Sequence, residues 1–99
     1  MLCYDNQYFL QALEGDRSLV SELFISIADD PRHDDVVIVS FDYITDSNFK
    51  SWQMGYAGSN SLLPQLLAKL KLKQFEPSEL TPNQCLAILT TLSTQQEEL

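Results

Sequence analysis

Basic residues are scarce in this 99-residue sequence, which holds six Lys and Arg against fourteen Asp and Glu. The net charge is −8 and the pI is near 4.2. DNA, RNA and anionic membrane surfaces are bound through basic faces, so this balance argues against nucleic acids and membranes as partners. A basic protein surface would suit the chain better, because opposite charges steer two partners together.

Long apolar runs are also missing. No stretch approaches the roughly 20 apolar residues that a bilayer span requires. Residues 1–5 lack the basic start and apolar core of a secretion signal. We therefore expect a cytoplasmic protein. Cys3 and Cys85 are then expected to be buried thiols rather than the two halves of a disulfide.

Glycine is rare, with three residues in the chain, and two of them, Gly55 and Gly58, lie in a turn-rich stretch that runs on to Ser61. This stretch predicts a body over residues 1–58 and a C-terminal appendage over residues 59–99. The charge supports the division, because ten of the fourteen acids precede residue 60. A hydrophobic fraction of 44% is enough for one modest core.

The first half of the body predicts a hairpin followed by a helix. Met1–Tyr4 and the β-rich Tyr8–Glu14 flank a short polar turn, which is typical of two antiparallel strands. A helix is predicted to begin after Asp16, a suitable N-cap. Its apolar residues recur at helical spacing, and Asp29-Asp30-Pro31 ends it.

Two further strands are predicted in the second half of the body. Val36–Phe41 is dense in β-branched residues and apolar enough for a sheet interior. Ser51–Ala57 carries Trp52, Met54 and Tyr56 at alternate positions, which is typical of a strand. The body is therefore predicted to be an α+β fold.

The appendage predicts two helices. Leucines spaced along residues 62–70 form an apolar stripe that is typical of a helix. The second helix has the clearest local start, because Thr81 and Gln84 form a capping-box pattern with Pro82 at the first helical position. The residues then predicted to line its apolar face are Cys85, Ile88, Leu89 and Leu92.

Few residues indicate chemistry by themselves. The only histidine, His33, lies among aspartates, and one histidine is too few ligands for a convergent metal site. A charge-paired turn at the helix end is the simpler interpretation. Neither cysteine has a basic sequence neighbour that would lower its pKa. Trp52 and Met54, two apart on a strand, suit a hydrophobic core better than a cofactor wall.

Gln11 is the most informative polar residue. It lies between Phe9 and Leu13 on one face of the predicted second strand, so an amide stands between two apolar neighbours. A buried amide has two donors and an acceptor to satisfy and usually has a defined polar partner. That partner is either a neighbouring protein group or a ligand, and the spacing alone leaves both open.

Three motifs, taken in order, resemble those of BLUF domains, the flavin-based sensors of blue light. Residues 8–15, Tyr-Phe-Leu-Gln-Ala-Leu-Glu-Gly, resemble the third-strand motif of the family. Residues 30–33, Asp-Pro-Arg-His, resemble its helix-end motif, and residues 49–54, Phe-Lys-Ser-Trp-Gln-Met, resemble its last-strand motif. The resemblance covers residues 1–57, with Met1–Tyr4 similar to the second strand. The rest resembles the two extra helices of short, stand-alone members.

The resemblance implies a ferredoxin-like sheet with FAD held between two helices on one face. By position, it gives Gln11 the hydrogen bond to the flavin ring and Ile27 the packing against that ring. It places Asp30 near the ribityl hydroxyls and His33 near the ribityl chain and phosphates, with Arg32 as a further candidate there. No metal and no enzymatic activity are implied, because the family consists of sensors.

The resemblance also implies a mechanism. In the family, excitation moves an electron and a proton between a tyrosine and the flavin. The glutamine then rotates or tautomerises, and the absorption shifts slightly to the red. Trp52 and Met54 would form the switchable end of the last strand and pass the signal to the two appended helices or to a partner protein. Short members often form rings or dimers, so a homo-oligomer is also implied.

The sequence departs from the family pattern at its N-terminus. The resemblance implies a first strand with the photoactive tyrosine and a first helix, whereas this sequence opens inside the second strand. We expect the chain to be truncated, and residues 1–99 alone to bind FAD weakly or not at all. The tyrosines that should not inherit the photoactive role are Tyr4, Tyr8, Tyr43 and Tyr56.

Two functions therefore stay open from the sequence. One is a FAD-binding photoreceptor that changes its contacts with a partner protein. The other is a flavin-free interaction module, or degenerate BLUF fragment, built on the same fold. A yellow colour in the purified protein would separate the two.

Overall fold

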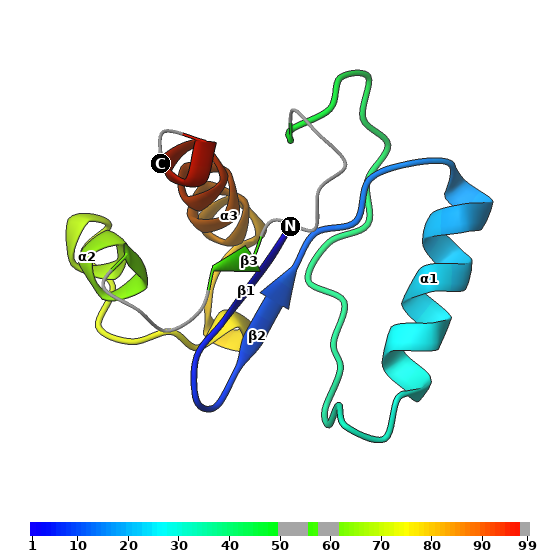
Figure 1. Ribbon diagram of the computed structural model, residues 1–99, viewed down its shortest axis with the longest axis horizontal. Coiled ribbons are helices and arrows are strands. Elements are labelled where there is room, and N and C mark those ends of the chain that lie inside the picture. The colour runs from blue at the N-terminus through cyan, green and yellow to red at the C-terminus, as the bar shows by residue number, and fades with distance from the viewer. Residues whose placement is uncertain (50–55, 58–61, 98–99) are drawn as a thin grey trace.

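The structure, a computed structural model, describes residues 1–49, 56–57 and 62–97. In chain order its elements are β1 (Leu2–Tyr4), β2 (Phe9–Gln11), α1 (Arg17–Asp29), β3 (Tyr56–Ala57), α2 (Leu62–Lys69), a short 3-10 helix (Pro77–Glu79) and α3 (Pro82–Glu97). The predicted α+β class is confirmed. Helix α1 lies on one side of the small sheet, and α2 and α3 lie on the other (Figure 1).

The predicted hairpin is present, with a shorter second strand than Tyr8–Glu14. Strands β1 and β2 pair antiparallel, with Cys3 opposite Leu10. The turn between them is closed by Asp5, whose carboxylate accepts hydrogen bonds of 2.8 Å from the backbone N–H groups of Gln7 and Tyr8. Beyond β2, Met1 and Ala12 exchange backbone hydrogen bonds of 3.0 and 3.2 Å, so the pairing continues past Gln11.

Strand β3 completes the sheet. It pairs parallel with the other edge of β1, with Leu2 opposite Tyr56, and the strand order is β2-β1-β3. This confirms the end of the strand predicted at Ser51–Ala57, while residues 51–55 lie outside the described residues. Within the described part of the chain, β2 pairs with β1 alone, so one edge of β2 carries no strand.

The prediction that Val36–Phe41 is an interior strand is wrong. The segment has no regular secondary structure, and Val37, Ile38 and Phe41 are 68%, 54% and 63% exposed. Val39 is partly buried and packs against the core. The physical reason is that a strand needs a hydrogen-bonded neighbour, and no described strand pairs with this segment. The β-branched composition indicates a preference for extended backbone and says nothing about whether a partner strand is available.

The core lies between the sheet and the two C-terminal helices. Cys3 and Leu10 point into it from the hairpin, and Ile88 from α3 is fully buried there. The remaining buried members of this cluster are Leu63, Leu66, Phe75, Cys85, Leu89 and Leu92. The buried face predicted for the last helix is therefore confirmed. The core residues come from both sides of the predicted boundary at residue 58.

Both cysteines are buried free thiols, as predicted. Burial, with a smaller contribution from the nearby Asp5 carboxylate, raises the pKa of Cys3 to about 12. Burial likewise raises the pKa of Cys85. Because the thiolate is the reactive form, these side chains serve as small core residues.

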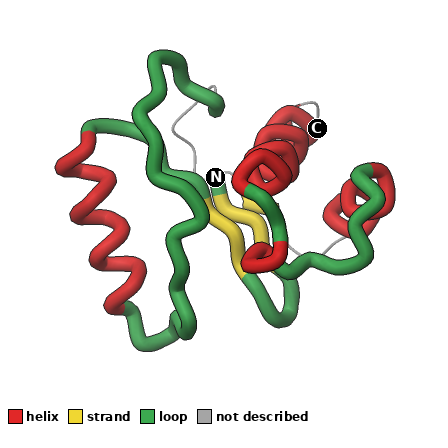
Figure 2. The backbone as a smooth tube through the Cα atoms, turned by 180° about the vertical axis from the view of Figure 1, so that it is seen from behind, coloured by secondary structure: helices red, strands yellow, loops and turns green. Residues whose placement is uncertain are grey.

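Helix α1 begins and ends where the sequence predicts. It begins after Asp16, which makes no side-chain capping bond, and it ends at Asp29. Asp30 is already extended, with φ −69° and ψ 123°, as a residue before proline prefers. None of the side chains of α1 is fully buried. The helix stands apart from the α2–α3 pair (Figure 2). None of the described helices is long and apolar enough to cross a bilayer.

The start of α3 confirms the predicted capping box. The Thr81 backbone N–H donates to the Gln84 side-chain oxygen at 2.9 Å. In return, the Gln84 backbone N–H donates to the Thr81 hydroxyl at 3.2 Å. Two donors of the first turn are therefore satisfied reciprocally, and Pro82 occupies a position where no intrahelical donor is needed.

Replacing Thr81 by alanine should lower the free energy of unfolding by about 1 kcal/mol, because one cap acceptor is removed. The matched control is Thr94→Ala, which removes a hydroxyl that bonds a carbonyl inside the same helix at 3.0 Å. Alanine is the better helix former, so the control should lose no stability. Urea denaturation of both variants measures the difference, and equal effects would contradict the capping role.

Candidate functional site

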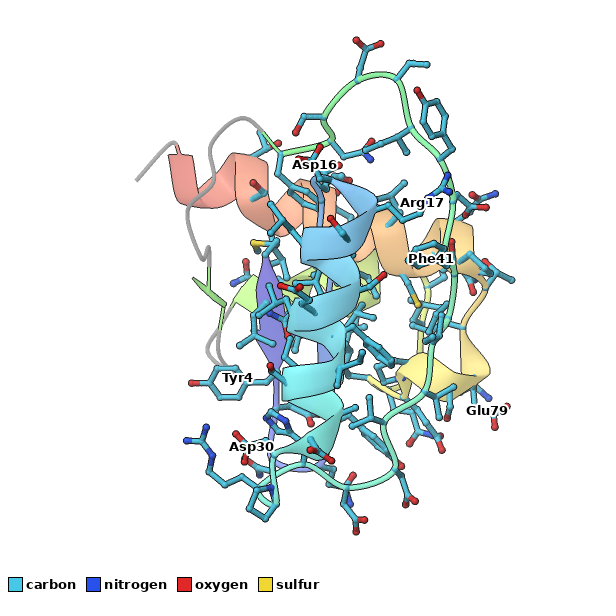
Figure 3. All side chains as sticks on the ribbon, turned by 90° about the vertical axis from the view of Figure 1, so that its right-hand side faces the viewer. Tyr4, Asp16, Arg17, Asp30, Phe41 and Glu79 are labelled. Atoms are coloured by element: carbon cyan, nitrogen blue, oxygen red, sulfur yellow. The ribbon has the colours of Figure 1, made fainter. Side chains whose placement is uncertain are left out.

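The candidate site is built on the face of the hairpin that points away from the core. Cys3 and Leu10 are directly opposite one another and both are buried against the C-terminal helices. Because side chains alternate along a strand, Gln11 and Phe9 lie on the other face, together with Tyr4. This is the side on which α1 lies, in front of the strands in the view of Figure 3.

Phe9 connects this sheet face to the end of α1. Its ring centroid lies 5.1 Å from that of His33, and the two ring planes are tilted by 38°. The same histidine turns its Nδ1 toward the carbonyl oxygen of Ile27 at 2.7 Å. A carbonyl oxygen only accepts, so Nδ1 carries the hydrogen and donates it. The second ring nitrogen, Nε2, is then the atom of His33 available to a ligand.

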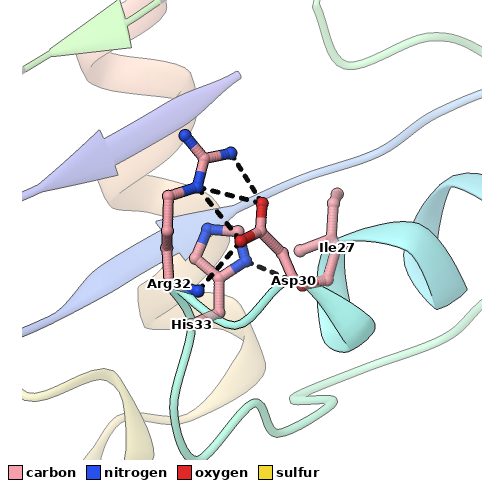
Figure 4. Close-up of polar contacts among 4 residues, drawn as sticks. All are labelled: Ile27, Asp30, Arg32 and His33. Carbon is pink, nitrogen blue, oxygen red and sulfur yellow. Dashed lines mark hydrogen bonds and ion pairs between the residues drawn. The ribbon is translucent and has the colours of Figure 1, made fainter.

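Asp30 and Arg32 form a tight ion pair beside this histidine (Figure 4). The guanidinium donates to both carboxylate oxygens, with a shortest N–O distance of 2.6 Å, and the Arg32 backbone N–H adds a bond of 2.9 Å. These bonds hold the pKa of Asp30 well below its usual range. The predicted charge-paired turn is therefore present.

Arg32 is the more exposed member of the pair, with 83% of its side chain accessible. The bonds to Asp30 use Nε and Nη2, so Nη1 keeps its two hydrogens for an anion. The Arg32 guanidinium compensates the negative charge of Asp30. An anionic group near the helix end would therefore meet a neutral pair rather than a bare carboxylate.

Gln11 is half-buried, and its side-chain amide makes no hydrogen bond within the described part of the chain. An amide that gives up part of its contact with water normally gains a protein partner in exchange. The alternative that Gln11 bonds a neighbouring group is thus not seen among these residues. Its free donors and acceptor suit a ligand with donor and acceptor atoms on one edge, which is the chemistry of a flavin ring.

The structure brings some predicted site residues together and leaves others outside its description. Ile27, Asp30, Arg32 and His33 cluster at the end of α1, and Phe9 links this cluster to the strand that carries Gln11. Trp52 and Met54 lie outside the described residues.

Sequence reasoning missed two residues of this region. The Phe9–His33 contact joins positions 24 apart in the chain, and no local pattern signals it. Glu14 binds the turn at residues 47–49 through both carboxylate oxygens. A carboxylate directly before a glycine, at the end of a strand, was the available signal. Burial raises the pKa of Glu14, but the bonds from Asn48, Ser47 and Phe49 outweigh burial and hold it below its usual value.

Comparison with known families gives one match. The family described as BLUF, sensors of blue-light using FAD, matches residues 1–55, which is more than half of the chain. BLUF domains are photosensors rather than enzymes. No curated protein and no solved structure matches the chain.

Replacing Gln11 by leucine should leave the free energy of unfolding unchanged or raise it. If protein hydrogen bonds held the glutamine, its replacement would instead lower the free energy of unfolding by about 1–3 kcal/mol, because its partners would lose their bonds. Leu10→Ala on the same strand is the comparison and should cost about 2–5 kcal/mol, since it opens a cavity in the core. Thermal and urea unfolding measure both variants. A clear loss of stability in Q11L would assign Gln11 a structural role.

Proposed function

We propose that this chain, which belongs to the BLUF family of blue-light sensors that use FAD, is a photoreceptor domain that binds FAD on the α1 side of its sheet. In this proposal it signals to a partner protein through a hydrogen-bond switch at Gln11. The observation that carries the proposal is the half-buried Gln11 amide without a partner in the described structure. Gln11 lies on β2, within residues 8–15, which resemble the third-strand motif of the family.

The residues present suit a flavin nucleotide. When bound, FAD would supply absorption of blue light and the light-driven transfer of an electron and a proton. Ile27 is half-buried on α1 and offers an apolar surface to a ring. His33 is already oriented by its bond to the Ile27 carbonyl oxygen, so its Nε2 is available to a ribityl hydroxyl or a phosphate.

The Asp30–Arg32 pair suits the polar end of the nucleotide. In the proposal, the Asp30 carboxylate accepts from ribityl hydroxyls while Arg32 directs its free Nη1 hydrogens at a phosphate oxygen. The pairing makes this division possible, because each partner compensates the charge of the other. An unpaired aspartate at this position would repel the phosphates.

Gln11 acts as the switch because its head is asymmetric. One end of the amide donates and the other accepts, so a half-turn exchanges the two roles without moving net charge. In the proposal, Gln11 would offer a bound flavin a stronger hydrogen bond after this exchange, and the absorption of the FAD would then shift slightly to the red. No described protein group holds the amide in one orientation, which leaves it free to turn.

The route to a partner protein would run through the opposite face of β2. Leu10, next to Gln11, is 7% exposed and packs in the same cluster as Ile88 of α3. The Tyr8 hydroxyl adds a hydrogen bond of 3.4 Å to Glu76, in the connection between α2 and α3. A displacement of β2 would therefore reach the C-terminal helices directly, and these present the output surface in this proposal.

A second function is favoured by one observation. Several large apolar side chains on the body are exposed, among them Val37, Phe41 and Tyr43. Such side chains suit a protein-interaction module that works without flavin. The same spectroscopic measurement decides between the two functions, because only the photoreceptor absorbs blue light.

Residues 1–99 alone should bind FAD weakly. One edge of β2 pairs with no strand among the described residues, and α1 has no fully buried side chain to fix its position. One wall of the flavin site is therefore poorly supported. The expected result is sub-stoichiometric FAD after gel filtration and incomplete binding in a flavin-fluorescence titration. Retention of one FAD per chain would contradict this expectation.

At saturating FAD, blue illumination should shift the absorption spectrum slightly to the red, and the shift should reverse in the dark. Q11L should bind FAD and lose the shift, because leucine has no donor or acceptor to exchange. The matched control is Q7L, which makes the same change at an exposed position in the hairpin turn. A full red shift in Q11L, or no red shift in the unmodified chain, would contradict the proposed mechanism.

A further inference from the structure

Glu14 binds three consecutive residues that lie far from it in sequence. Its Oε1 accepts from the Ser47 hydroxyl at 2.7 Å and from the Phe49 backbone N–H at 3.3 Å. Its Oε2 accepts from the Asn48 backbone N–H at 2.8 Å and from the Asn48 side-chain nitrogen at 3.0 Å. The single hydrogen of the Ser47 hydroxyl is shared with the Phe49 carbonyl oxygen, which also lies 2.7 Å away. Each carboxylate oxygen therefore faces two donor groups, one of them shared.

These bonds anchor a segment that has little else to hold it. Residues 34–49 contain no regular secondary structure. Among the described residues, every hydrogen bond that joins this segment to the rest of the chain goes to Glu14. Val39 and Phe49 add apolar contacts with the core. Glu14 thus fixes the end of the segment from which the chain continues toward β3.

The other end of this connection is the strand that carries Gln11. Ala12 follows Gln11 and is locked to Met1 by two backbone hydrogen bonds. Glu14 stands two residues beyond that locked position. A short stretch of backbone therefore joins the strand of Gln11 to the Glu14 carboxylate, which binds the turn at residues 47–49.

We propose that Glu14 is a positioning residue that ties the turn at Ser47–Phe49 to the strand of Gln11, so that movement of this strand reaches the residues after Phe49. The light-dependent part of this inference rests on the proposed function, in which Gln11 is the switch. Glu14 touches no flavin in the proposal and acts through the turn alone. Phe49 precedes the only tryptophan of the chain, Trp52, by three positions.

The deciding variant is Glu14→Gln. The amide keeps one oxygen and replaces the other by an NH₂ group, which would face the two N–H donors of Asn48 or the donors of Ser47 and Phe49. In the first orientation both Asn48 bonds are lost. In the second the Phe49 bond is lost, whereas the Ser47 hydroxyl can accept from the new NH₂ group. Glu22→Gln is the matched control, because it removes the same charge from an exposed position on α1. Thr81→Ala controls for a loss of stability far from the turn.

The first measurement needs no flavin. Trp52 fluorescence and its quenching by acrylamide in E14Q should differ from those of the unmodified chain, whereas E22Q and T81A should match it. Should E14Q fail to fold, Asn48→Ala removes one of the four bonds and should give a smaller change of the same sign. Unchanged Trp52 fluorescence in the folded variants would overturn the positioning role.

The second measurement uses the chain at saturating FAD. E14Q should keep the light-induced red shift, since Gln11 is intact, and should recover in the dark several-fold faster than E22Q and T81A, because the switch region is less restrained. Recovery at the control rate would overturn the coupling to the switch. If the unmodified chain shows no light response, the proposed function fails, and the Trp52 result alone decides the role of Glu14.

Discussion

The antiparallel pairing of β1 with β2 is the interaction on which the rest of the structure depends. Its register places Cys3 opposite Leu10, and both are buried against the C-terminal helices. Because side chains alternate, the same register turns Gln11 toward α1. A slip of one residue would exchange the faces and bury the amide in the core. One set of backbone hydrogen bonds therefore fixes both the core and the candidate switch.

Local features of the fold could be predicted from the sequence because their causes are local. The end of α1 before Pro31 and the reciprocal bonds of Thr81 with Gln84 each depend on residues a few positions apart. The segment Val36–Phe41 was mispredicted because strand formation also depends on a distant partner. Its composition favours extended backbone, yet no described strand offers it hydrogen bonds.

In the candidate site, too, local features could be predicted and contacts between distant residues could not. An amide between apolar neighbours marked Gln11, and the charged motif after α1 marked the Asp30–Arg32 pair. The contact of Phe9 with His33 and the partners of Glu14 could not be predicted, because these interactions join residues 24 to 35 positions apart. Such contacts follow from how the hairpin and the chain after α1 are placed in space, and no short pattern encodes that placement.

The two faces of β2 give the proposed signal a physical route. Phe9 and Gln11 lie on the α1 side, while Leu10 between them is held in the core with α3. A packed core resists small deformations and passes a displacement on rather than absorbing it. The amide, in contrast, has no described protein partner that would keep it in place. In the proposed function, a group that is free to turn thus sits on a strand that is packed against the core. This combination would convert a local change of hydrogen bonding into a change at the C-terminal helices.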